Sequence, residues 1–198
     1  MRLPKPDNRL YLGRGGSGKT SLALEHAAQF DRVLMVRPDD SEPPRFPSAR
    51  SSHELARAMS QDKFRLCINA YMSVENWELA NEAAIAAGDT VVIWEEAHLF
   101  IRSRSLMDFA PHAFNLWMHG RHFGCRVFAI SIRPAGLTAD LRANLARAVI
   151  FNTTEEADLQ FYRHMIPDRS IIPKLDFAHH DAVDWTTSGY AVKRAPFP

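Results

Sequence analysis

The sequence predicts an α/β protein in which a mainly parallel sheet lies between two layers of helices. Strand-like apolar runs alternate along the chain with segments of helical periodicity, which is the order that builds such a three-layer fold. A glycine-rich turn also joins the first apolar run to a helix, an arrangement typical of phosphate-binding α/β proteins. The chain has 198 residues, 46% of them hydrophobic and 24% charged. We therefore expect a single domain over residues 1–198, with a core over about 8–166 and a C-terminal extension over about 167–198.

The first half of the chain divides at its glycines, prolines and capping residues. Pro38 halts the second strand, the Pro- and Ser-rich segment 39–50 is expected to be a loop, and Gly88 stops a long helix. The elements expected here are strands at Leu10–Leu12, Arg32–Val36, Phe64–Ala70 and Val91–Trp94, and helices at Gly18–Gln29, Ser52–Met59 and Val74–Ala87.

The second half continues the alternation and ends differently. We expect a loop or short turn over 96–105, helices at Leu106–His122, from Thr138 or Asp140 to Leu145, and from Thr153 or Thr154 to Met165, and strands at Arg126–Ser131 and Ala148–Phe151. Pro111 would sit in the first turn of its helix. Residues 182–185 and 190–192 flank a turn and predict a C-terminal β-hairpin.

Residues 13–20 match the phosphate-binding pattern G-x-x-x-x-G-K-[ST], the P-loop, at every fixed position. The glycines let consecutive backbone N–H groups point at phosphate oxygens, at the positive end of the following helix. Lys19 would reach the β- and γ-phosphates, and the Thr20 hydroxyl would bind Mg²⁺, with Ser21 as the alternative. ATP and Mg²⁺ are the expected cofactors. The expected nucleotide-binding residues are Gly13, Arg14, Gly15, Gly16, Ser17, Gly18, Lys19, Thr20 and Ser21.

A second motif is the apolar run 90–94 followed by Glu95 and Glu96. A continuous β-branched run predicts a strand buried on both faces, and ligands of open α/β sheets bind at the carboxyl ends of such strands. Glu95 is therefore expected to hold Mg²⁺, through water, and Glu96 to orient and deprotonate the attacking water. The acid pair follows the fourth strand, which indicates the additional-strand, catalytic-glutamate type of P-loop fold.

Positive charge is concentrated in one part of a chain whose net charge is only +1. The stretch from residue 102 to residue 147 contains seven arginines but only two acidic residues, Asp108 and Asp140. The stretch is consistent with a solvated surface, with a track for a DNA backbone, or with arginines offered to a neighbouring subunit's nucleotide.

The remaining composition indicates a soluble intracellular protein. Cys67 and Cys125 both lie in apolar runs, as buried thiols of a reducing compartment do. The N-terminus carries no secretory signal pattern, and no run approaches the about 20 apolar residues that a membrane helix needs.

Five segments together resemble the FtsK/HerA superfamily of DNA-pumping ATPases. They are the P-loop, Glu95-Glu96-Ala97-His98, Gly120-Arg121-His122-Phe123-Gly124, the strand 127–132 ending in Arg133-Pro134, and Leu141-Arg142-Ala143-Asn144. The resemblance covers roughly residues 13–151. The compact length is most similar to the genome-packaging ATPases of internal-membrane icosahedral viruses.

This resemblance implies ATP hydrolysis coupled to translocation of double-stranded DNA, largely independent of sequence, and packaging of a viral genome into a preformed capsid. It implies a homo-oligomeric ring, with capsid-vertex or inner-membrane proteins as further partners, located in the host cytoplasm or at the virion packaging vertex. The alternatives are an assembly or secretion ATPase of the filamentous-phage type, a small-molecule P-loop kinase, and a nucleotide-dependent scaffold without catalysis.

The chain departs from the family pattern at two positions. Family members usually carry Asp where Glu95 stands and often Gln where Ile132 stands, so Ser131 or Arg133 would serve as the γ-phosphate sensor. The resemblance also implies an arginine acting in trans on the next subunit's nucleotide. Arg121 is the first choice for it, with Arg102, Arg104 and Arg142 as alternatives. The segments 39–50 and 100–105 are the candidates for the DNA-contacting loop.

Overall fold

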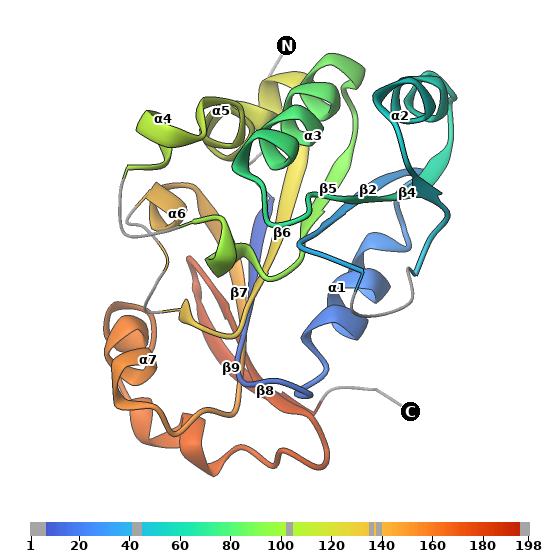
Figure 1. The fold of residues 1–198 in the computed structure, drawn as a ribbon. Coiled ribbons are helices and arrows are strands. Elements are labelled where there is room, and N and C mark those ends of the chain that lie inside the picture. Colours follow the sequence, from blue (N-terminus) through green and yellow to red (C-terminus); the bar gives the residue numbers. More distant parts are fainter. Residues whose placement is uncertain (1–6, 41–44, 102–104, 135–136, 138–139, 195–198) are drawn as a thin grey trace.

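The computed structural model describes residues 7–40, 45–101, 105–134, 137 and 140–194, and in this part of the chain nine strands form one sheet in the order β3-β4-β2-β5-β6-β1-β7-β8-β9 (Figure 1). The strands from β3 to β7 pair in parallel, and β8 and β9 are antiparallel additions at one edge. The strands are β1 (Asn8–Leu12), β2 (Arg32–Arg37), β3 (Ser48–Ala49), β4 (Phe64–Asn69), β5 (Val91–Trp94), β6 (Arg126–Ser131), β7 (Leu145–Phe151), β8 (Asp181–Thr186) and β9 (Gly189–Arg194).

One strand stands between the strand that leads to the P-loop and the strand that leads to the acid pair. β6 pairs with β1 on one side, Tyr11 opposite Ile130, and with β5 on the other, Ile93 opposite Phe128. This inserted strand is the feature of the additional-strand type of P-loop fold, which confirms the prediction of the fold class.

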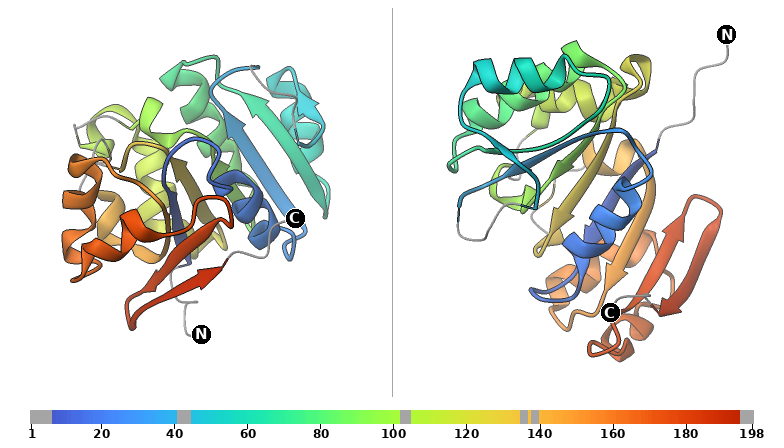
Figure 2. Two further views of the ribbon diagram at one scale, coloured as in Figure 1. Left: turned by 90° about the horizontal axis from the view of Figure 1, so that it is seen from below. Right: turned by 90° about the vertical axis from the view of Figure 1, so that its right-hand side faces the viewer.

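Helices cover both faces of the sheet, as Figures 1 and 2 show. Val33 and Met35 of β2 pack on the face covered by α1, whereas Leu34 and Val36 pack on the face covered by α2 and α3. The side chains of β2 alternate between the two faces of the sheet because successive side chains of a strand point to opposite faces. The helices are α1 (Lys19–Ala27), α2 (Ser52–Met59), α3 (Val74–Ala87), α4 (Leu106–Phe109), α5 (Pro111–His119), α6 (Asp140–Ala143) and α7 (Glu156–Phe161).

The expected C-terminal hairpin is confirmed. β8 continues the sheet from β7, with Val183 opposite Ile150, and Gly189 begins the exposed return strand β9. Both cysteines are buried and free, also as expected, and the Cys125 Sγ lies 3.4 Å from the carbonyl oxygen of Ala84.

The expected helix Leu106–His122 is wrong in its continuity. Ala110 is non-helical (φ −145°, ψ 67°), so α4 ends at Phe109 and Pro111 begins α5 as its first residue. The residue before a proline is driven out of the helical region, and proline favours the first helical position, which explains the break. The last turn, Gly120–Phe123, is a 3₁₀ helix that Gly124 ends at φ 71°.

Three other boundaries differ from the expectation. The segment 39–50 contains the short strand β3, whose Ser48 and Ala49 pair with β4. Leu145 begins β7 rather than ending α6, and α7 gives way to a 3₁₀ turn (Tyr162–His164) before Met165. Of the two caps expected for α6, Thr138 lies outside the described residues, whereas the Asp140 carboxylate accepts a hydrogen bond from the Leu106 N–H at 2.9 Å.

A cluster of buried aromatic side chains supports the carboxyl end of β5. Trp94 lies with its ring centroid 5.0 Å from that of Trp77 and 5.8 Å from that of Trp117, and Trp77 stacks on Phe100 at 5.2 Å. The Trp94 Nε1–H donates to Asn81 Oδ1 at 2.8 Å, so this buried donor is satisfied. The residue that immediately precedes the acid pair is therefore held on several sides.

Candidate nucleotide-binding site

The P-loop leaves β1 through a turn that requires glycine. Gly13 has φ +145°, and a Cβ added there would lie 2.8 Å from the Cβ of Phe151 on β7. The Gly13 N–H donates to the Ser131 carbonyl at the end of β6 at 3.3 Å. Gly18, at φ 90°, then caps α1 in the left-handed conformation that glycine adopts without strain. The loop is thus placed between the ends of β6 and β7, directly at the start of α1.

Lys19 is the first residue of α1 and is almost fully buried. Its Nζ donates to the Arg14 carbonyl at 2.7 Å, so the lysine closes the loop on itself. Burial lowers the pKa of Lys19 to about 8, and the nearby Glu96 carboxylate acts in the opposite direction. A buried ammonium with this surrounding is well placed to meet the negative charge of a phosphate.

Glu95 and Glu96 follow β5 and reach the same place from the other side. Glu96 has φ 48° and ψ 46°, a left-handed conformation that is uncommon for a side chain of this size. Glu95 Oε1 lies 3.5 Å from the Thr20 hydroxyl on α1. The P-loop and the acid pair, which are distant in the sequence, are therefore brought together as predicted.

Thr20 and Glu95 fit the magnesium site that the sequence predicts for them. A hydroxyl and a carboxylate, both partly buried and facing each other, are the hard oxygen donors that Mg²⁺ prefers. Ser21, the alternative to Thr20, lines the same cavity. The Thr20 hydroxyl is the one that lies 3.5 Å from Glu95 Oε1.

A cavity of about 410 Å³ unites these elements, within the size range of small-molecule sites. The P-loop supplies one wall, the ends of β2 and β5 supply the floor, and a C-terminal residue closes one side. The lining residues are Gly15, Gly16, Ser17, Gly18, Lys19, Thr20, Ser21, Arg37, Pro38, Asp39, Arg45, Glu95, Glu96 and His180. Gly13 and Arg14, the other two residues predicted to bind the nucleotide, are not among these lining residues.

Arg37 is a site residue that the sequence reading missed. Its Nε lies 3.1 Å from Glu95 Oε2, and both side chains are almost fully buried. The signal in the sequence is that Arg37 ends an apolar strand and stands next to Pro38. Ligands of open α/β sheets bind at the carboxyl ends of such strands.

His98, the last residue of the segment Glu95-Glu96-Ala97-His98, lies beside Glu96. The His98 Nδ1 is 3.4 Å from Glu96 Oε2. Burial lowers the pKa of His98, and the charges of Arg133 and Lys19 lower it further. A neutral imidazole therefore faces the carboxylate at neutral pH.

The two expected sensor residues lie at the same edge of the sheet but not in the cavity wall. Ser131 is fully buried, and its Oγ accepts a hydrogen bond from the Arg133 N–H at 3.1 Å. Arg133 is near enough to His98 to lower its pKa. The Ser131 hydroxyl is thus used to shape the turn, whereas the Arg133 charge acts on the neighbourhood of Glu96.

The C-terminal extension packs on the P-loop, which the sequence reading did not foresee. The Arg14 guanidinium carbon lies 3.5 Å from the centroid of the Phe177 ring, and the His180 Nδ1 is 3.1 Å from the carbonyl oxygen of Ser17. Residues 177–180 therefore contact the loop, and His180 also lines the cavity.

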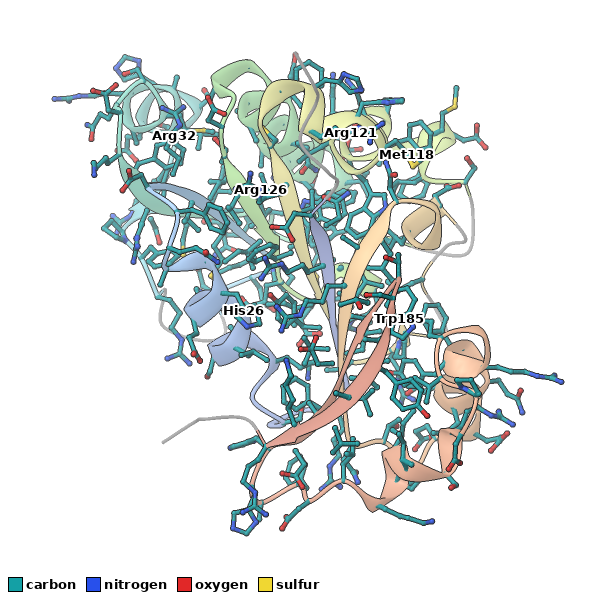
Figure 3. The ribbon with its side chains drawn as sticks, turned by 180° about the vertical axis from the view of Figure 1, so that it is seen from behind. His26, Arg32, Met118, Arg121, Arg126 and Trp185 are labelled. Carbon is teal, nitrogen blue, oxygen red and sulfur yellow. The ribbon has the colours of Figure 1, made fainter. Side chains whose placement is uncertain are left out.

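Arg121, the first choice for an arginine acting in trans, lies far from its own chain's cavity. It belongs to the 3₁₀ turn that precedes β6, at the edge of the sheet where the parallel strands begin, and it lines a small hollow with Asp7, Trp117 and Asn144 (Figure 3). Arg102 and Arg104 lie outside the described residues, and α6 carries Arg142.

Not all the arginines between 102 and 147 present free positive charge. Arg147 forms a bidentate pair with Asp184 of β8, its Nε 2.6 Å from Oδ1, and the Arg126 guanidinium lies 4.4 Å from the centroid of the Phe30 ring. The positive face expected from the composition is accordingly reduced by these internal contacts.

Within the described residues, no helix is long and apolar enough to span a membrane. No protein-family model and no curated protein sequence matches the chain.

Similar solved structures do exist. One is the genome-packaging NTPase B204 of Sulfolobus turreted icosahedral virus 2 in complex with AMPPCP, with a TM-score of 0.79 at 17% identity over 98% of each chain. The N-terminal domain of the zonular occludens toxin of Neisseria meningitidis matches with a TM-score of 0.55 at 16% identity, over 98% of this chain and 96% of that one. The pCW3 conjugation coupling protein TcpA with ATPγS matches with a TM-score of 0.64 at 12% identity, over 98% of this chain and 61% of that one. These likenesses confirm, at the level of the fold, the resemblance expected from the sequence.

Proposed function

We propose that this chain is an ATPase that couples hydrolysis of ATP to translocation of double-stranded DNA and packages a viral genome into a preformed capsid. The observation that carries the proposal is the convergence of Lys19, Thr20, Glu95 and Glu96 in one cavity beneath a glycine-rich loop. A nucleotide-binding site accounts for the presence of all four residues in one place, whereas a purely structural role does not account for this combination.

The binding step follows from the P-loop. The backbone N–H groups of residues 15–20 and the N-terminus of α1 would hold the phosphates, and Lys19 would exchange its bond to the Arg14 carbonyl for the β- and γ-phosphate oxygens. This exchange needs little reorganisation, because Lys19 is already in the cavity wall.

The hydrolytic step belongs to Glu96. Its carboxylate lines the cavity beside Lys19, where it can orient a water molecule and accept its proton as the water attacks the γ-phosphate. His98 lies beside that carboxylate, its Nδ1 3.4 Å from Glu96 Oε2. Mg²⁺, held by Thr20 and by Glu95 through water, would neutralise charge on the phosphates when bound.

The motor part of the proposal is supported by the fold of a viral genome-packaging NTPase over nearly the whole length of both chains. An arginine supplied by a neighbouring subunit would stabilise the charge that develops during phosphoryl transfer, so hydrolysis would require an assembled ring. The remote position of Arg121 suits a role toward another subunit better than a role in its own cavity. Arginines on the surface would hold the DNA backbone without reading bases.

We further propose that residues 1–198 act as one unit, as a soluble protein of the host cytoplasm or the packaging vertex, with capsid-vertex or inner-membrane proteins as partners. Ser131 or Arg133 remains the proposed γ-phosphate sensor, and Arg133 would act through its position near His98.

The test is phosphate release by the purified chain in the presence and absence of double-stranded DNA. We expect release that requires ATP and magnesium and that rises with DNA, and no nucleotide binding by Lys19→Ala. Phosphorylation of a small acceptor without any effect of DNA would instead identify a kinase. Nucleotide binding without turnover under all conditions would identify a scaffold.

A further inference from the structure

A buried ion pair lies inside the cavity beside the proposed magnesium ligands. Arg37 Nε is 3.1 Å from Glu95 Oε2, and the two side chains are 6% and 13% exposed. The other oxygen of the same carboxylate, Oε1, faces the Thr20 hydroxyl at 3.5 Å. The two oxygens of Glu95 are therefore divided between an arginine of β2 and a threonine of α1.

The sheet places this arginine through its backbone. β2 and β5 pair in register, Val36 opposite Trp94, so Arg37 and Glu95 are the next residues of adjacent strands. The Glu95 N–H donates to the Val36 carbonyl at 2.9 Å, and the Arg37 carbonyl accepts from the Ala70 N–H at 2.8 Å. The backbone of Arg37 is thus bonded toward β4 while its side chain reaches toward β5.

Glutamate has one more rotatable side-chain bond than aspartate, so its carboxylate is less well defined by the backbone alone. A guanidinium is planar and presents its donors in a rigid fork, and it fixes the plane of a carboxylate better than an ammonium does. We propose that Arg37 is a positioning residue that pins one oxygen of Glu95 and so presents the other to the hydroxyl of Thr20. This inference rests on the proposed nucleotide-binding function of the cavity.

The test is a double-mutant cycle on the binding of AMPPCP, measured with Mn²⁺ and again with EDTA. The ratio of the two dissociation constants gives the gain in affinity that the metal supplies. The four proteins are the wild type, Arg37→Met, Glu95→Asp and the double variant. Binding is measured instead of turnover, so the outcome does not depend on hydrolysis.

We expect Arg37→Met to lower the metal-dependent gain by about tenfold to a hundredfold, the usual effect of losing a residue that orients a metal ligand. In the Glu95→Asp background the same substitution should change the metal-dependent gain by less than about twofold. The shorter aspartate side chain no longer places its carboxylate oxygen where Arg37 holds that of Glu95. An equal loss in both backgrounds would overturn the inference, since Arg37 would then act independently of Glu95.

Arg32→Met is the matched control. Arg32 lies on the same strand at its opposite end and donates to the carbonyls of Met59, Gln61 and Ala87, so it is a partly buried, hydrogen-bonded arginine outside the cavity. It should leave the metal-dependent gain unchanged.

Two further comparisons keep the inference testable. If Arg37→Met fails to fold, Arg37→Lys keeps the charge without the fork, and it should lose a smaller part of the gain in the Glu95 background only; an unchanged gain would overturn the inference. Lys19→Ala tests the proposed function separately. If the wild type and Lys19→Ala bind AMPPCP equally, the nucleotide site is wrong and the role of Arg37 falls with it. If only Lys19→Ala fails to bind, the nucleotide site stands. A loss of metal-dependent gain in Arg37→Met that is equal in the Glu95 and Glu95→Asp backgrounds then overturns only the positioning role of Arg37.

Discussion

Lys19 at the start of α1 and Glu96 just after β5 line one cavity, and the Glu96 carboxylate partly offsets the effect of burial on the pKa of the lysine. Neither residue is near the other in the sequence. Their meeting depends on β6, which separates β1 and β5 while keeping both carboxyl ends at one edge of the sheet.

The pKa of Lys19, about 8, predicts how nucleotide binding depends on pH. Below this pH the ammonium is already charged, and above it binding must take up a proton, so affinity for metal-free ATP should fall by about tenfold per pH unit. Titrations from about pH 7 to about pH 9.5 check this. Lys19→Arg, which stays charged, should bind with a flat profile if it binds at all, and a sloping profile would contradict the assignment.

The lowered pKa of Lys19 makes folding stability change with pH in the opposite direction from the affinity for ATP. The pKa of Lys19 is lower in the folded chain than the ordinary lysine value of 10.5, so the unfolded state holds more protons between about pH 8 and pH 10.5. Stability should therefore rise with pH through this window, a trend that Lys19→Met should reduce in urea denaturation.

Glu96→Gln should bind ATP as tightly as the wild type but hydrolyse it about 10²- to 10⁴-fold more slowly, because an amide cannot accept the proton of the attacking water. Phosphate release and ATP binding, measured side by side, separate these effects. The control is Glu82→Gln, an exposed residue of α3. Equal turnover in the two variants would remove Glu96 from the mechanism.

Arg121→Ala should retain nucleotide binding and lose about 10³-fold or more of the hydrolysis if, as we propose, this arginine acts on the nucleotide of a neighbouring subunit. Mixing Arg121→Ala subunits with Lys19→Ala subunits should restore part of the activity at intermediate ratios. Arg57→Ala, an exposed arginine of α2, serves as the control. A mixture that stays inactive at every ratio counts against action in trans.

Phe177→Ala should loosen the P-loop by removing the ring under Arg14. A cation–π contact of this kind contributes about 0.5–2 kcal/mol, so affinity for ATP should fall by about threefold to thirtyfold. Amide hydrogen exchange at residues 15–17 should accelerate as well. Tyr190→Ala removes an exposed aromatic ring of β9 and should change neither quantity.

Much of this architecture could be predicted because its signals are local. The spacing of the P-loop and the unbroken apolar run before Glu95 are each contained in a few residues, and a parallel sheet brings the ends of its strands together as a matter of geometry. The hairpin could be predicted for the same reason, from two strand-like runs around a turn.

The features that escaped prediction depend on contacts between distant segments. The sequence around Arg37 does not predict its ion pair with Glu95, because the register of β2 against β5 brings the two residues together. Phe177 and His180 are likewise ordinary residues in a segment without periodicity, and only the tertiary structure brings them to Arg14 and Ser17. The break at Ala110 could have been predicted because Ala110 stands before Pro111, but the prediction placed Pro111 in the first turn of one continuous helix.

The packing of residues 177–180 on residues 14–17 also bears on how the chain matures during synthesis. The glycine-rich turn leaves the ribosome well before the ring and imidazole that contact it, because His180 follows Ser17 by 163 residues. Contacts of such long sequence separation form slowly and late. The growing polypeptide therefore carries a phosphate-binding loop without these contacts until residues 177–180 have emerged.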